Sequence, residues 1–345
     1  MKNYIFNILL SFMLIVVFTG CKKNFTGLSA TANEIFWVTN NGADMPVWVK
    51  GNMRSNVMIL IVHGGPGDGA YSFSDYETSA LREKYGVAFW DQRNAGASSG
   101  NSNISKLSLS QMVNDLEAVV KVIKYRYQGV HIFLYAHSFG GLLTSAYLVK
   151  DTNQNNINGL IDIDGAHNYP LCNNLSKKML IDSGSVQIKA NKNSMDWQEI
   201  VIYCNANDPV NSYLAANQIE TYAHKAESLM GVNNSTSTNL FTPEDPSATL
   251  SNYLKLYYTN AGDHFTESLQ MANYSTQLNR ITIPALLLWG KYDFTVPSGV
   301  ANDAISNLSS SYKKLVFFNQ SGHRPMMEEP DAVQREISLF VQQFK

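Results

Sequence analysis

Three residues far apart in the chain have the types and the order needed for acyl transfer by a serine nucleophile. Ser138 stands between an apolar, strand-like segment, 131–136, and a helix-forming segment, 142–150. A serine at such a sharp strand-to-helix turn exposes its hydroxyl above a sheet. His323 is the expected base for its proton and Asp293 the expected orienting acid, because each follows a late apolar segment. Asp164 is a second candidate for the orienting acid, but Asp293 has the better local context.

A glycine-rich turn supplies the expected oxyanion-binding groups. The sequence H-G-G-P-G occupies residues 63–67, directly after the apolar run 56–62. Glycines leave backbone N–H groups free to approach a ligand closely. The N–H of Gly65, or that of Gly64, is therefore expected to join the N–H of Phe139 in an oxyanion hole. His63 is expected to be a structural hydrogen-bonding residue.

Strand-like and helix-like segments alternate around these residues. Several segments are apolar on both faces, as expected of strands covered by helices on both sides. The clearest helix is 108–128, where apolar residues recur at helical spacing. The alternation predicts an α/β fold with a mostly parallel central sheet. The predicted strands are 34–38, 45–51, 56–62, 86–90, 131–136, 159–163, 283–289 and 314–318.

The stretch 166–280 differs in composition and interrupts the alternation of strand-like and helix-like segments. It is rich in Asn, Ser, Tyr and Met, and its segments are better interpreted as helices than as strands. We therefore expect a mainly helical cap inserted between two parts of the core, 34–165 and 281–345.

The N-terminus predicts export and anchoring. Lys2 precedes an apolar run that is too short for a comfortable membrane span, so 1–20 is interpreted as a signal peptide. Cys21 follows small residues, as in a bacterial lipoprotein signal, and is the expected lipidation site, with 21–33 as a tether. The alternative is an ordinary signal or an uncleaved anchor in which Cys21 is incidental. The expected location is the bacterial cell envelope, periplasmic or surface-exposed, with membrane contact through the lipid only.

Composition narrows the possible partners. The formal net charge of −2 gives no electrostatic case for binding nucleic acid. Cys172 and Cys204 lack the clustered spacing of a metal site, and we expect neither a metal nor an organic cofactor. In an oxidising compartment these two cysteines either pair or remain buried thiols, and the sequence leaves both open.

Together these motifs resemble the α/β-hydrolases, most closely the proline iminopeptidase branch of the serine peptidases. The resemblance rests on H-G-G-P-G, D-Q-R at 91–93, A-H-S-F-G-G at 136–141, W-G-K-Y-D at 289–293 and S-G-H at 321–323. It covers roughly 50–165 and 280–345. Asn94 and Ala136 depart from the family pattern, where glycine is usual. The resemblance implies the α/β-hydrolase fold and the removal of an N-terminal residue, often proline, from peptides.

An aminopeptidase of this kind needs an acidic group in the cap to hold the substrate's ammonium. The candidate cap acids, which the sequence does not separate, are Glu199, Glu220, Glu227 and Glu267. Bulky residues near predicted strand ends are candidates for an apolar pocket or for ordinary core: Trp90, Phe139, Tyr169 and Phe294.

Two other functions compete with the aminopeptidase. One is a carboxylesterase or amidase acting on a small hydrophobic substrate with the same triad, since a fold does not fix a substrate. The other is a catalytically inactive surface lipoprotein that only binds. The expected partner is a small peptide or ester, and the sequence leaves the oligomeric state open.

Overall fold

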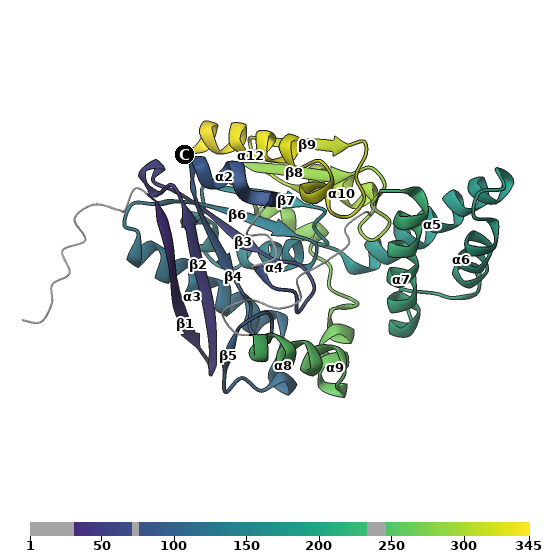
Figure 1. Cartoon of the computed structure of the whole chain (residues 1–345), viewed down its shortest axis with the longest axis horizontal. Helices are drawn as coiled ribbons and strands as arrows, with labels where there is room; N and C mark the ends of the chain where they lie inside the picture. Colours follow the sequence, from purple (N-terminus) through teal and green to yellow (C-terminus); the bar gives the residue numbers. More distant parts are fainter. Residues whose placement is uncertain (1–30, 71–75, 233–245) are drawn as a thin grey trace, which may run out of the picture.

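The computed structural model describes residues 31–70, 76–232 and 246–345 and contains the predicted α/β core (Figure 1). Its sheet has nine strands in the order β1-β2-β4-β3-β6-β7-β8-β9, with β5 paired to β2. The strands are β1 (Ala32–Asn40), β2 (Ala43–Gly51), β3 (Val57–Val62), β4 (Gly86–Trp90), β5 (Ser99–Gly100), β6 (His131–His137), β7 (Gly159–Ile163), β8 (Ala285–Gly290) and β9 (Lys313–Phe318). From β4 through β9 along this order all neighbours are parallel.

Helices cover both faces of the sheet because its central strands are apolar on both sides. In β3, Met58, Leu60 and Val62 belong to one buried cluster. The alternate residues Val57, Ile59 and Ile61 belong to another, as the two-residue period of a strand requires. The first face is packed by α3 (Leu109–Arg126), α4 (Phe139–Leu148) and α10 (Ser298–Asn307). The second is packed by α2 (Ser79–Lys84), α11 (Pro325–Glu328) and α12 (Pro330–Phe344).

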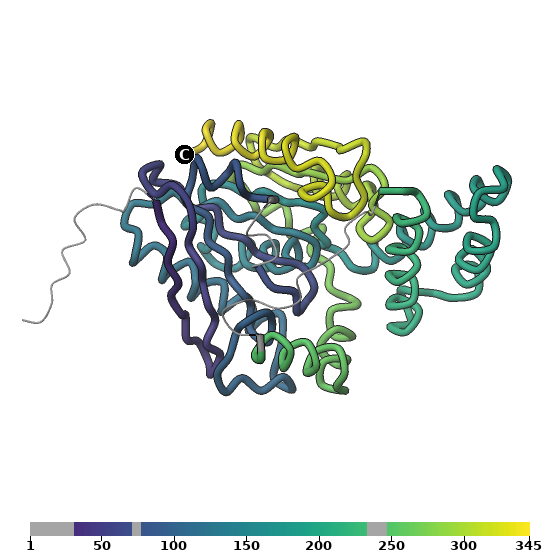
Figure 2. The backbone as a smooth tube through the Cα atoms, viewed as in Figure 1, coloured from purple at the N-terminus to yellow at the C-terminus, as the bar shows by residue number. Residues whose placement is uncertain are grey.

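The helical insertion lies between β7 and β8. It contains α5 (Tyr169–Lys189), α6 (Ser194–Ala206), α7 (Tyr213–Met230), α8 (Pro246–Tyr257) and α9 (Asn260–Leu269). Helices α5 to α7 project to the right of the sheet, whereas α8 and α9 lie at the bottom of the view, under the sheet (Figure 1). The tube view shows the chain leaving the core for the teal helices and returning through the green ones (Figure 2).

The α5–α7 part of the cap has its own small core. Leu180, Trp197, Ile200 and Ala223 are buried together, and Phe294, from the loop after β8, is fully buried among them. The Phe294 and Trp197 ring centroids are 6.2 Å apart. A core residue next to Asp293 therefore ties this part of the cap to the loop after β8.

Some predicted boundaries and open questions are resolved. Strand β1 begins at Ala32, so the expected tether end at residue 33 is slightly late, because the strand pairs with β2 over its whole length. Cys172 and Cys204 are both buried free thiols. The predicted signal peptide, 1–20, and Cys21 lie outside the described residues. In the described ranges, the helices are too short or too polar to cross a bilayer.

Candidate active site

Ser138 occupies a strained turn between β6 and α4. Its φ of 54° and ψ of −121° lie outside the conformations that a serine prefers. The turn requires close backbone contact: a Cβ on Gly140 would come within 2.1 Å of the Val62 carbonyl oxygen, and one on Gly141 within 2.5 Å of the Gly165 Cα. Only glycine fits at these two positions, so the small residues after Ser138 hold the turn against the ends of β3 and β7.

Asp293 and His323 are hydrogen-bonded to each other in the interior. His323 Nδ1 lies 2.9 Å from Asp293 Oδ2, and both side chains are buried. The other oxygen of Asp293 accepts hydrogen bonds from the N–H groups of Thr295, at 2.9 Å, and Val296, at 2.7 Å. The backbone thus fixes the carboxylate, and the carboxylate fixes the imidazole with its Nε2 away from Asp293, as a general base requires.

The serine turn lies against the histidine loop through its neighbour, His137. His137 Nε2 is 3.0 Å from the His323 carbonyl oxygen, and the two ring centroids are 5.0 Å apart. Within the described residues, the Ser138 hydroxyl has no hydrogen bond to His323. Such catalytic contacts are commonly long in unliganded enzymes and shorten when substrate binds.

The expected oxyanion groups lie beside Ser138. A Cβ on Gly64 would be 3.1 Å from the Ser138 Cβ, so this backbone passes directly over the serine. Gly65 has a φ of +105°, in the region that favours glycine. Phe139 is the first residue of α4, and the N–H groups of a first helical turn have no acceptor within the helix.

The D-Q-R segment positions this glycine-rich loop. Asp91 accepts hydrogen bonds from the N–H groups of Ala70, at 2.7 Å, and Ala97, at 2.6 Å. Gln92 donates to His63 twice, from its N–H to the ring Nε2 at 3.1 Å and from its amide to the carbonyl oxygen at 2.9 Å. His63 thus has the structural role expected from the sequence.

Two acids at the C-terminal end of α11, just after the histidine loop, support this loop and were not assigned this role from the sequence. Glu328 Oε2 accepts the Gly322 N–H at 2.7 Å. Glu329 Oε2 accepts from the Gln320 N–H, at 2.9 Å, and the Ser321 hydroxyl, at 2.7 Å. The adjacent acidic pair that follows S-G-H was the available signal.

The cap presents acids to His323 from one face of α7. Glu220, His224 and Glu227 are spaced four and three residues apart, which places them on the same side of the helix. His224 is exposed at the surface, but desolvation by the surrounding protein, and next the charge of His323, lower its pKa to about 4, so its ring is neutral at pH 7. This face of α7 therefore contributes acidic side chains and no cation to the site.

The two acids on this face differ in accessibility. Glu227 is 1 % exposed, accepts the Phe294 N–H at 3.1 Å and packs against Gly322. Burial, and next the Asp293 charge, raise its pKa to about 8. Glu220 is open to solvent, although the surrounding protein still raises its pKa by desolvation, and His323 acts in the opposite direction.

The structure places the other predicted substrate-binding residues away from His323 or in the core. Glu199 is at the protein surface, where it binds Lys225 at 3.0 Å and accepts from the Tyr222 hydroxyl at 3.1 Å. Glu267 is exposed beside His264, at 3.7 Å. Trp90 has no exposed surface, so its expected place in a substrate pocket is not supported. The Phe139 side chain is likewise fully buried, and Tyr169 is half-buried at the start of α5.

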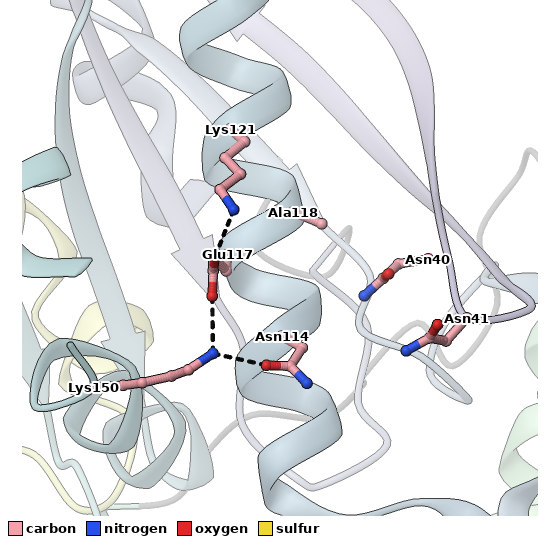
Figure 3. A pocket seen from close by; sticks show the side chains of 7 residues that line it. All are labelled: Asn40, Asn41, Asn114, Glu117, Ala118, Lys121 and Lys150. Carbon is pink, nitrogen blue, oxygen red and sulfur yellow. Dashed lines mark hydrogen bonds and ion pairs between the residues drawn. The ribbon is translucent and has the colours of Figure 1, made fainter. Parts of the chain in front are cut away.

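A surface cavity of about 390 Å³ lies elsewhere, and none of the predicted site residues lines it (Figure 3). Its two lysines share one carboxylate: Lys150 binds Glu117 and Asn114, both at 2.9 Å, and Lys121 binds Glu117 at 2.5 Å. The cavity is lined by Asn40, Asn41, Asn114, Glu117, Ala118, Lys121 and Lys150. We assign it no part in the chemistry.

A family model described as "alpha/beta hydrolase fold" matches residues 57–330, most of the chain. The chain is an α/β-hydrolase. It is also 26% identical over 293 residues to a proline iminopeptidase from Heyndrickxia coagulans, covering 82% of this chain and 90% of that protein. The chain therefore belongs to an enzyme family and resembles the proline iminopeptidases, as the sequence motifs predicted.

Solved structures of proteins with different activities have the same fold. A proline iminopeptidase from Mycobacterium smegmatis superposes with a TM-score of 0.63 at 14% identity, covering 90% of this chain and 98% of that one. An esterase from Exiguobacterium antarcticum gives 0.57 at 19% identity, covering 89% and 98%. These likenesses support the architecture and leave open whether this α/β-hydrolase cleaves peptides or esters.

The pH dependence of activity should reflect the setting of His323. Burial alone would lower the pKa of His323, but the charge and hydrogen bond of Asp293, with Glu227, outweigh it and raise the pKa above 6.5. The base must be neutral to accept a proton, so activity should rise with pH and be half-maximal above 6.5. This limb is measured as kcat/KM against pH with a neutral ester. A midpoint below 6.5 would contradict this electrostatic account.

Proposed function

We propose that this α/β-hydrolase is an aminopeptidase that releases the N-terminal residue of short peptides through an acyl-enzyme. Ser138 attacks the scissile carbonyl and His323 accepts its proton, then returns that proton to the leaving amine. Asp293 holds the imidazole tautomer. The N–H groups of Phe139 and of Gly65 or Gly64 stabilise the oxyanion, and water then releases the acyl group.

The observation that carries this proposal is the buried His323–Asp293 hydrogen bond beside the Ser138 turn, under an acidic cap helix. Similarity to a proline iminopeptidase supports the choice of peptides over other acyl compounds. Membership of an enzyme family, with the histidine and acid paired, argues against an inactive binding protein.

We propose Glu220 as the partner of the substrate's ammonium. It is the acid on the inner face of α7 that solvent, and hence substrate, can reach, and its carboxylate lies close enough to His323 for the two to affect each other's charge. Glu227 faces the same site but is buried against the Asp293 loop, where it holds the cap to the core. Tyr257 lies close enough to Glu220 for the charge of this acid to raise its pKa, after the larger effects of desolvation by the surrounding protein and of Asp68.

A carboxylesterase is the second candidate, supported by the esterase among the solved structures of the same fold. A substrate panel separates the two. We expect hydrolysis of aminoacyl-naphthylamides, including the prolyl compound, and loss of that activity in Ser138→Ala. Fast cleavage of p-nitrophenyl esters with no release of naphthylamine would replace the aminopeptidase by the esterase.

Glu220→Gln should weaken aminopeptidase activity selectively. A charge-assisted hydrogen bond contributes about 1.5 kcal/mol or more, so kcat/KM for the aminoacyl substrate should fall about tenfold. Hydrolysis of an uncharged ester should be unchanged. Glu199→Gln is the matched control, since Glu199 is on the cap surface with Lys225 and should leave both activities intact. Equal losses with both substrates would exclude ammonium binding by Glu220.

We further propose that the enzyme is a lipid-anchored protein of the bacterial cell envelope, modified at Cys21. The support is the sequence alone: a short apolar run followed by small residues and a cysteine. Expression with Cys21→Ser should move the protein from the membrane fraction to the soluble fraction. The wild-type protein, in the membrane fraction, should be labelled by a clickable palmitate analogue. Equal membrane association of the variant, with no label in wild type, would contradict lipidation.

A further inference from the structure

A second buried carboxyl group lies directly behind the histidine–acid pair. Asp164 follows β7, has a positive φ of 48° and is completely buried. Its Oδ1 accepts the N–H of Gly290, the last residue of β8, at 2.9 Å. One carboxylate oxygen of Asp164 and ring nitrogens of His137 and His323 all lie within 4.8 Å of one another. The residue is thus built into the catalytic edge of the sheet.

The second oxygen of Asp164 has no hydrogen-bond donor. Within the described residues, Oδ2 is buried and unpartnered. The neighbouring Asp293 is an acceptor that already receives three N–H groups, from His323, Thr295 and Val296. If Asp164 and Asp293 were both ionised, their buried carboxylates would repel each other. A proton on one of them turns the contact between the two groups into a hydrogen bond.

We propose that Asp164 is a positioning residue that remains protonated in the active enzyme and donates a hydrogen bond to the Asp293 carboxylate. This inference rests on the proposed function in one respect: Asp293 must be the acid that orients the base. In agreement, burial, followed by the Asp293 charge, raises the pKa of Asp164 well above its usual range, and the contact with Asp293 adds to the effect.

The proton on Asp164 has two consequences for His323. It gives Asp293 a fourth donor, which fixes the carboxylate more firmly. It also keeps a further full negative charge away from the imidazole, so that the pKa of His323 is raised by Asp293, and less by Glu227, but not by Asp164. The other titratable or charged groups that act on this cluster are Glu220, His224 and Glu227 from α7, Arg324 and Glu328 from the histidine loop and α11, and His137 and Tyr135 from β6.

The test compares Asp164→Asn with Asp164→Ala in the full-length enzyme with an ester substrate. Asparagine can accept a hydrogen bond from the Gly290 N–H and donate one to Asp293, as the protonated acid does. Both kcat and the acidic limb of the plot of kcat/KM against pH should therefore match wild type. Alanine removes the donor, and kcat should fall about tenfold with KM unchanged. If Asp164 is ionised instead, Asp164→Asn removes a charge and moves the acidic limb to lower pH, which would overturn the proposal. An unchanged kcat in Asp164→Ala would also overturn it.

A spectroscopic readout keeps this inference separate from the proposed function. The infrared spectrum at pH 7 should contain the carbonyl stretch of a protonated carboxylic acid that disappears in Asp164→Asn. Glu227→Gln is the matched control, because Glu227 is a second buried acid and should remove a different band. A band that persists in Asp164→Asn would refute the protonated state, even in an enzyme with no peptidase activity. A lost band with no hydrolysis of any substrate would instead refute the proposed function.

Discussion

The hydrogen bond between His323 and Asp293 is the interaction on which the account of this enzyme depends. It joins the loops after β8 and β9, two adjacent parallel strands in register from Ala285 with Lys313 to Gly290 with Phe318. Because parallel strands end at the same edge, the two loops begin side by side. Gly290 lets them approach further, since a Cβ there would lie 1.8 Å from the Gly322 carbonyl oxygen. The sheet therefore fixes the base before any substrate binds.

The cap contacts the Asp293 loop and the oxyanion loop, which couples substrate selection to catalysis. In α7, Glu227 accepts the Phe294 N–H, and Phe294 packs into the cap core one residue after Asp293. In α8, the Tyr257 hydroxyl donates to the Pro66 carbonyl oxygen at 3.0 Å, on the oxyanion loop. A change in the position of the cap would therefore move the orienting acid or the oxyanion groups.

The sequence predicted the fold and brought residues 138, 293 and 323 into one hypothesis because each stands just after an apolar, strand-like segment. The positions of the strands follow from the local pattern of apolar residues, and the order of the three residues can be taken directly from the chain. The cap was harder, since Glu199, Glu220 and Glu227 look alike in sequence and differ only in where their helices pack. Trp90 was misjudged for a related reason: an aromatic residue at a strand end can face the core as readily as a cleft. The burial of Asp164 behind Asp293 also depends on long-range packing that no local pattern contains.

The most direct test of the central claim is whether Ser138 is the nucleophile that the His323–Asp293 pair activates. The purified enzyme is treated with a fluorophosphonate, digested and mapped by mass spectrometry, with the labelling rate compared between wild type and His323→Ala. The account predicts one modified residue, Ser138, and far slower labelling in the variant. Labelling of another residue, or an equal rate in a folded His323→Ala protein, would contradict it.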